Sequence, residues 1–201
     1  MKITAIEGPL NKGSLYRVYV DSKPAGYLSA EDVLNLHLSV HQELNRQAYS
    51  RLTCQVRFTS DYLAALKYTE SRLRSKSEVE LYLKRRRCDA ASARKIITKL
   101  EDLGIIDENK LVAAFIHDSE NIRPLSKRHL KLKLKQKQID PEIISLNMEE
   151  SGYDELAALD KIITAKASRY ANKQERFFRY LLRQGFNYND IASRIGPPTK
   201  H

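Results

Sequence analysis

Two histidines and one cysteine are the candidates for catalytic or metal-binding chemistry in this chain. His37 and His41 stand four apart, but the intervening Leu-Ser-Val lacks the glutamate of a metalloprotease helix. Cys88 follows three arginines, which could lower its thiol pKa, although its place before a predicted helix favours a buried structural cysteine. The seven glycines are dispersed and form no phosphate-binding loop. We therefore predict a protein that is not an enzyme, with no metal site and no cofactor.

Positive charge is the strongest chemical signal, and it is concentrated in the middle third of the chain. The formal net charge is +10, and residues 72–138 hold 18 Lys and Arg against 9 Asp and Glu. A local surplus attracts phosphate backbones with a strong salt dependence. A scattered surplus would only keep the surface solvated. The concentration favours binding to a nucleic acid or to a filament that contains one.

Most of these cations fall on two predicted helices, residues 76–87 and 126–138, and Arg94 continues the charge on the helix of residues 89–103. Residues 84–87 end the first helix with more charge than a helix C-terminus needs. Stacked repeats would merge both helices into one basic surface that reads charge and shape rather than base sequence. The candidate binding residues are Lys84, Arg85, Arg86, Arg87, Arg94, Lys127, Arg128, Lys131, Lys133, Lys135 and Lys137.

The N-terminal segment, residues 1–55, predicts a small β-sheet with a helix. Residues 15–20 are rich in aromatic and β-branched side chains, which favour a strand. A turn at residues 21–24 and a short strand at residues 25–28 follow. Ser29 is a suitable N-cap for the first helix.

Helical periodicity takes over at about residue 58 and repeats at a spacing of about 46 residues. The fold class is therefore mainly α: tandem three-helix repeats in an elongated array, preceded by a small β-rich (α+β) segment. The three repeats span residues 58–105, 106–152 and 153–201. Their predicted helices are 60–72, 76–87 and 89–103, then 107–119, 126–138 and 140–151, then 153–170, 173–184 and 187–195.

Equivalent residues mark the same points in every repeat. The third helices begin at the N-cap types Asp89, Asp140 and Asn187, each after an apolar residue. Every second helix carries an apolar pair at i and i+4, which predicts one buried stripe. These pairs are Val79 and Leu83, Leu130 and Leu134, and Phe177 and Leu181. Gly104, Gly152 and Gly196 close the third helices.

Residues 130–135 alternate Leu and Lys strictly, which taken alone indicates a strand. Ser126 as an N-cap and the alignment with the other repeats indicate a helix, and we predict the helix. Leu132 then lies off the buried stripe. It is either a contact residue for a partner or an ordinary half-exposed leucine.

The rest of the composition indicates a cytoplasmic protein. No apolar run approaches the ~20 residues of a membrane helix, and the N-terminus lacks the apolar core of a signal peptide. Cys54 and Cys88 lie far apart, which suits a reducing compartment.

Residues 75–83 and 96–108 carry a family resemblance. The first segment reads SKSEVELYL, and the second, IITKLEDLGIIDE, leads into the apolar LVAAFI of residues 111–116. Their order and spacing resemble the RecX regulators of bacterial recombination. One departure is Lys137-Gln138, where the family has a Lys-Gly turn.

The resemblance implies a partner, the RecA-type recombinase filament on single-stranded DNA. RecX proteins restrain strand exchange and ATP hydrolysis by that filament, and some contact DNA directly. We expect a monomeric DNA-recombination regulator of this kind. The alternatives are a stand-alone, non-sequence-specific nucleic-acid-binding protein and an enzyme acting on nucleic acid.

Reversing any two of Arg85, Arg86, Arg87, Lys131, Lys133 and Lys135 should weaken binding and flatten its salt dependence. The slope of log affinity against log salt should fall by about one for each phosphate interaction that is removed. Titrations over a range of salt concentrations measure this, with circular dichroism as the control for helix content. Unchanged binding would mean that the basic face is solvated surface.

Overall fold

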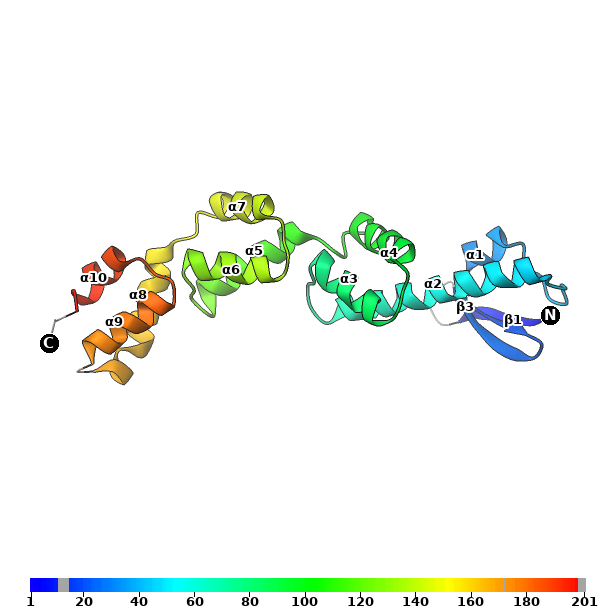
Figure 1. The fold of residues 1–201 in the computed structure, drawn as a ribbon, viewed down its shortest axis with the longest axis horizontal. Coiled ribbons are helices and arrows are strands. Elements are labelled where there is room, and N and C mark those ends of the chain that lie inside the picture. The colour runs from blue at the N-terminus through cyan, green and yellow to red at the C-terminus, as the bar shows by residue number, and fades with distance from the viewer. Residues whose placement is uncertain (11–14, 172, 199–201) are drawn as a thin grey trace. The chain divides into compact units, whose positions relative to one another are not determined.

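The computed structural model describes residues 1–10, 15–171 and 173–198. The predicted fold class is confirmed as mainly α-helical, with a small N-terminal sheet (Figure 1). The elements are β1 (Ile3–Leu10), β2 (Leu15–Val20), β3 (Lys23–Ser29), α1 (Ala30–Asn35), α2 (Arg46–Glu70), α3 (Lys76–Arg85), α4 (Ala90–Asp102), α5 (Glu108–Asn121), α6 (Lys127–Gln136), α7 (Pro141–Glu150), α8 (Glu155–Lys166), η1 (Ser168–Tyr170), α9 (Gln174–Arg183) and α10 (Tyr188–Ile195).

The chain forms two compact units. The first consists of Met1–Arg72 and Val79–Ile105, and the second of Leu73–Glu78 and Ile106–His201. The first unit therefore holds the sheet and most of the first repeat. The second holds the second and third repeats together with the start of α3. The division into four segments drawn from the sequence stays a prediction.

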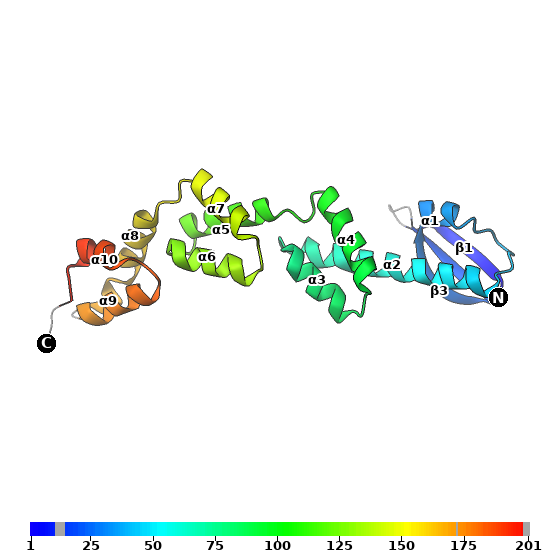
Figure 2. The same cartoon turned by 45° about the horizontal axis from the view of Figure 1, so that its top comes forward.

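The sheet is antiparallel, in the order β1-β2-β3. Asp21 and Ser22 join β2 to β3 with φ angles of 47° and 62°, as a two-residue hairpin turn requires. One face of the sheet packs on α1 and α2 (Figure 2). Their shared core contains Ile3, Val18, Val20, Leu28, Leu44 and Leu52.

Gly26 sets how closely β3 approaches α2. Its φ is +145°, and a Cβ built there would lie 2.2 Å from Cγ1 of Val56. No other residue type combines this backbone conformation with this space. The absence of a side chain at Gly26 thus allows α2 to pack closely against β3.

The helix predicted at residues 60–72 is the C-terminal part of a much longer helix. α2 runs from Arg46 to Glu70 and begins at Asn45, whose side chain accepts a hydrogen bond from the Ala48 NH at 2.8 Å. The predicted start was wrong because α2 is stabilised by its contact with the sheet. Tertiary packing of this kind overrides weak local propensity.

The buried pairs and helix N-caps predicted for the repeats are confirmed, whereas Gly196 ends α10 with φ of 77° and ψ of 157°, which is not the left-handed helical conformation. The apolar pairs of α3, α6 and α9 are buried, with Leu83, Leu134 and Leu181 each 0% exposed. Asp89, Asp140 and Asn187 each accept a hydrogen bond from a backbone NH of the helix they begin. Ser126 does the same for α6, so the Leu-Lys alternation is helical.

A left-handed residue follows each second helix. Arg87, Gln138 and Gly185 have φ angles of 61°, 57° and 84°. The turn that ends in Gln138, where the sequence resemblance implies glycine, therefore keeps the backbone conformation that glycine prefers. Gly104 and Gly152 adopt it at the ends of the third helices, with φ of 65° and 60°.

The third repeat differs from the prediction in its first helix. The sequence predicts one helix over residues 153–170, whereas α8 ends at Lys166 and a short 3-10 turn, η1, covers Ser168–Tyr170. The ring of Tyr170 stacks on Phe177 of α9, with centroids 4.6 Å apart. The tighter 3-10 turn brings the Tyr170 ring into contact with α9.

Two buried serines in the second unit make equivalent hydrogen bonds between helix ends. The Ser75 hydroxyl donates to the carbonyl of Lys137 at 2.8 Å, and the Ser126 hydroxyl donates to the carbonyl of Gln184 at 2.6 Å. Both serines are 0% exposed. Each also accepts a hydrogen bond from a backbone NH three residues on, so one hydroxyl caps one helix and satisfies the end of another.

A carboxylate completes each of these junctions. The backbone NH of Lys76 donates to Glu108 at 3.1 Å, and that of Lys127 donates to Glu155 at 2.8 Å. These glutamates open α5 and α8, the first helices of the second and third repeats. The same hydrogen-bonding pattern therefore occurs twice, which extends the repeat from helices to their junctions.

Gly26→Ala should destabilise the first unit by about 3 kcal/mol or more, because the new methyl overlaps Val56 and the backbone is strained. Gly104→Ala is the matched control. Its φ is +65° but nothing lies within 4 Å of the added Cβ, so it should cost about 1 kcal/mol. Urea unfolding measures both, and equal destabilisation would contradict the steric argument.

Candidate functional site

α6 presents the densest group of cations. Its ten residues, KRHLKLKLKQ, include no acidic side chain. Leu130 and Leu134 point into the core of the second repeat and fix the rotation of the helix. Helical periodicity of 3.6 residues per turn then directs most of the remaining side chains outward.

The five lysines and arginines of α6 are exposed and carry charge that is unpaired with any residue in the described part of the chain. They are Lys127, Arg128, Lys131, Lys133 and Lys135. Leu132, which lies among them, is 49% exposed, so the sequence-based expectation that it lies off the buried stripe is confirmed.

Lys137 is used within the fold. Its Nζ lies 3.0 Å from Oε2 of Glu78, and the side chain is only 17% exposed. The ammonium also lies 5.6 Å from the ring centroid of Phe115. Its charge is therefore largely satisfied, and Lys137 is a poorer candidate for a partner contact than its neighbours.

The basic residues at the end of α3 also include one cation that is paired within the fold. Lys84, Arg85, Arg86 and Arg87 are all exposed, but Arg86 also donates from Nε to Oδ1 of Asp61 at 2.9 Å. The Asp61 side chain is 6% exposed, and its hydrogen bond raises the pKa of Arg86 above its usual range. Arg86 thus neutralises a buried carboxylate.

Two neighbours complete this cluster in the first unit. Arg57, on α2, lies 4.0 Å from the Asp61 carboxylate and donates to the carbonyl of Arg87 at 2.7 Å. Arg94, at the start of α4, is exposed and donates to the carbonyl of Ala90 at 3.2 Å. No sequence pattern pointed to Asp61, which lies 25 residues before its partner.

Cys88 is half-buried beside the same carboxylate. Burial, followed by the negative charge of Asp61, raises the pKa of its thiol to about 11. The suggestion of a lowered pKa from the adjacent arginines is therefore wrong, because Arg86 points to Asp61 and the thiol is desolvated. The structural interpretation of Cys88 is the better one.

The third repeat holds cations that the sequence-based prediction did not include. α9 carries Arg176, Arg179 and Arg183, all exposed, and Arg179 pairs with Glu175. A sum of charge over the last third of the chain does not reveal these arginines, because the acidic residues of α7 and α8 balance them. Counting charge per helix would have found them.

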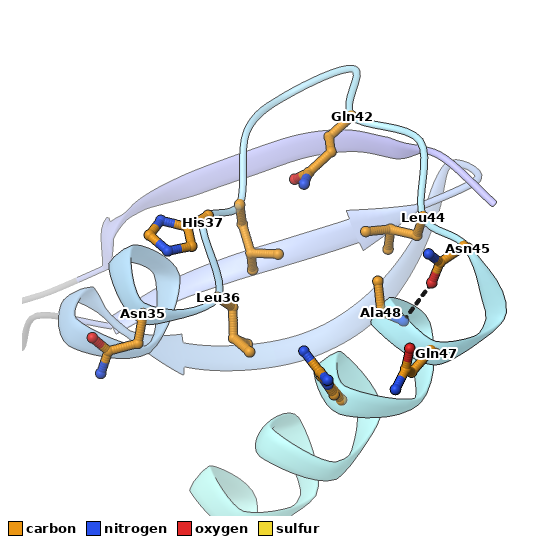
Figure 3. A pocket seen from close by; sticks show the side chains of 10 residues that line it. Asn35, Leu36, His37, Gln42, Leu44, Asn45, Gln47 and Ala48 are labelled. Carbon is orange, nitrogen blue, oxygen red and sulfur yellow. Dashed lines mark hydrogen bonds between the residues drawn. The ribbon is translucent and has the colours of Figure 1, made fainter.

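A pocket of about 190 Å³ lies between the 36–45 turn and the start of α2 (Figure 3). Side-chain amides, His37 and Arg51 line it. His37 and His41 adopt φ of 49° and 72° in this non-helical turn. Among the described residues, no group of three His, Cys, Asp or Glu side chains could hold a metal ion.

Comparison with known proteins shows which proteins this chain resembles. No family model matches the chain. The chain is 28% identical to the regulatory protein RecX of Finegoldia magna over 193 residues, 92% of this chain and 94% of that protein. It is 26% identical to RecX of Clostridium beijerinckii, covering 96% and 93% of the two chains. Over more than nine-tenths of its length the chain is similar to regulatory proteins named RecX.

Solved structures agree on the fold. A crystal structure of regulatory protein RecX matches with a TM-score of 0.76, covering 96% of this chain and 98% of that one at 20% identity. RecX from Lactobacillus salivarius matches with a TM-score of 0.59 and 27% identity over 68% of this chain and 92% of that one. Within the residues described, the chain has no helix long and apolar enough to cross a membrane.

Arg86→Ala should lower the free energy of unfolding by about 1–3 kcal/mol, because it leaves the Asp61 carboxylate buried without its nearest cation. Arg85→Ala removes an exposed neighbour and should cost less than about 0.5 kcal/mol. Urea unfolding of both variants measures the difference. Equal effects would show that the Arg86–Asp61 pair contributes nothing.

Proposed function

We propose that this chain binds the RecA-type recombinase filament on DNA and restrains its strand exchange and ATP hydrolysis. The observation that carries the proposal is α6, whose five exposed cations have no counter-charge among the described residues. A polyanionic partner would supply that counter-charge, and the similarity to RecX regulatory proteins indicates the class of partner.

Electrostatics explains how such a partner would be recognised. Exposed lysines and arginines gain most of their binding energy by releasing counterions from phosphate, whatever the base sequence. A regulator of a filament that forms on any DNA sequence needs binding of this kind, which does not depend on the base sequence. The exposed cations at the end of α3 and on α9 would add contacts of the same kind.

Tandem repeats suit a periodic partner. Several weak basic helices on one chain bind a repeating lattice more tightly than any one of them alone, because each contact raises the effective concentration for the next. We propose that the bound chain occludes neighbouring protomers and so blocks filament growth. It acts as a monomer in the cytoplasm, by binding and without turnover of its own.

The wild-type chain at saturation should suppress the DNA-stimulated ATPase and strand exchange of the cognate recombinase. Lys131→Glu combined with Lys135→Glu should need about tenfold more protein for the same suppression, because two attractive contacts become repulsive. Steady-state ATP hydrolysis and strand-exchange assays with titrated protein measure this.

Lys23→Glu combined with Lys67→Glu is the matched control. Both lysines are exposed and lie outside the candidate site, so net charge changes equally while α6 stays intact. Full suppression by both double variants would remove α6 from the mechanism. No suppression by the wild-type chain would reject the proposed function. Binding to naked DNA alone would then favour the stand-alone nucleic-acid-binding alternative.

A further inference from the structure

The outward side of α6 has an apolar centre. Leu132 stands midway between the buried Leu130 and Leu134, so helical geometry directs it away from the core. Its neighbours one turn away are Arg128 on one side and Lys135 on the other. We call Leu132, Arg128, Lys131 and Lys135 the Leu132 face.

The same arrangement recurs in the first repeat. Leu81 stands midway between the buried Val79 and Leu83 on α3 and is 49% exposed, as Leu132 is. Lys84 and Arg85, one turn on, are exposed as well. An apolar residue therefore occupies the outward centre of both second helices that carry the basic surplus.

An exposed leucine alone indicates nothing, since much of any protein surface is apolar. Leu146 shows this: it stands midway between the buried Ile144 and Met148 on α7, is 54% exposed, and lies on a helix without a single cation. The Leu132 face differs because unpaired cations surround the leucine. Apolar anchors rimmed by charge are the usual anatomy of protein–protein interfaces.

We infer that the Leu132 face docks on protein, namely an apolar depression rimmed by carboxylates on the recombinase, rather than on nucleic acid. Phosphate contacts use cations and gain nothing from an aliphatic side chain, and bases stack on aromatic or guanidinium groups. A leucine gains affinity when a protein pocket removes it from water. Charge complementarity then requires acidic side chains around that pocket.

This inference rests on the proposed function and assigns separate roles to the exposed cations. The Leu132 face holds the protein component of the filament. Exposed cations away from that face, such as Lys133 on α6 and Arg176 and Arg183 on α9, remain for phosphate. Filament binding should then respond to the leucine, and binding to bare DNA should not.

The test compares two probes: recombinase filaments on single-stranded oligothymidine, and the same oligothymidine alone. Leu132→Ser should weaken binding to filaments about five- to tenfold, because the half-exposed leucine is no longer there to be buried in the complex. Binding to the bare oligonucleotide should stay within about twofold. Co-sedimentation and fluorescence anisotropy measure the two affinities.

Two further variants make the result specific. Leu146→Ser removes a leucine of similar exposure from a helix without cations and should change neither affinity. Leu132→Met keeps an apolar side chain of similar volume and should retain filament binding. Circular dichroism confirms that each variant remains helical.

The outcomes separate this inference from the proposed function. Unchanged filament binding by Leu132→Ser overturns the inference while filament binding by the wild-type chain upholds the function. An equal weakening for filaments and bare oligonucleotide also overturns it and makes the Leu132 face a nucleic-acid contact. A wild-type chain that does not bind filaments rejects the proposed function itself.

Discussion

The two inward side chains on the second helix of each repeat set the direction of every other side chain on that helix. Leu130 and Leu134 in α6, like Phe177 and Leu181 in α9, are almost fully buried. Because an α-helix turns 100° per residue, fixing these two positions leaves most of the others facing outward. Burial of a narrow apolar stripe thereby creates the broad basic surface on which the proposed function depends.

Not all of that charge serves the same purpose. Arg86 and Lys137 look like their neighbours in the sequence, but each compensates a carboxylate, Asp61 in one case and Glu78 in the other. Removing one member of a partly buried pair is costly, because the other charge then stays desolvated without compensation. The exposed lysines of α6 have the opposite character, since they form no ion pair with any residue in the described part of the chain.

The junctions of the second unit keep that surface open. Ser75 and Ser126 use backbone groups at helix ends, and Glu108 and Glu155 cap neighbouring NH groups. These contacts occupy helix termini rather than outward faces. The junctions are therefore made without covering the cations, as the proposed contact with a polyanionic partner requires.

Local rules, applied to sequence alone, located the repeats, the ends of most helices and the positive charge. The N-caps at Asp89, Asp140 and Asn187 and the left-handed Gly104 and Gly152 follow from residue type and spacing within one or two turns. The length of α2, the pairing of Arg86 and Lys137 and the raised pKa of Cys88 became visible only in the folded chain. Each depends on a group distant in sequence: the sheet beneath α2, Asp61 on that helix, or Glu78 on α3. Periodicity reports only neighbours within a few turns, whereas desolvation and ion pairing depend on whatever the fold brings close.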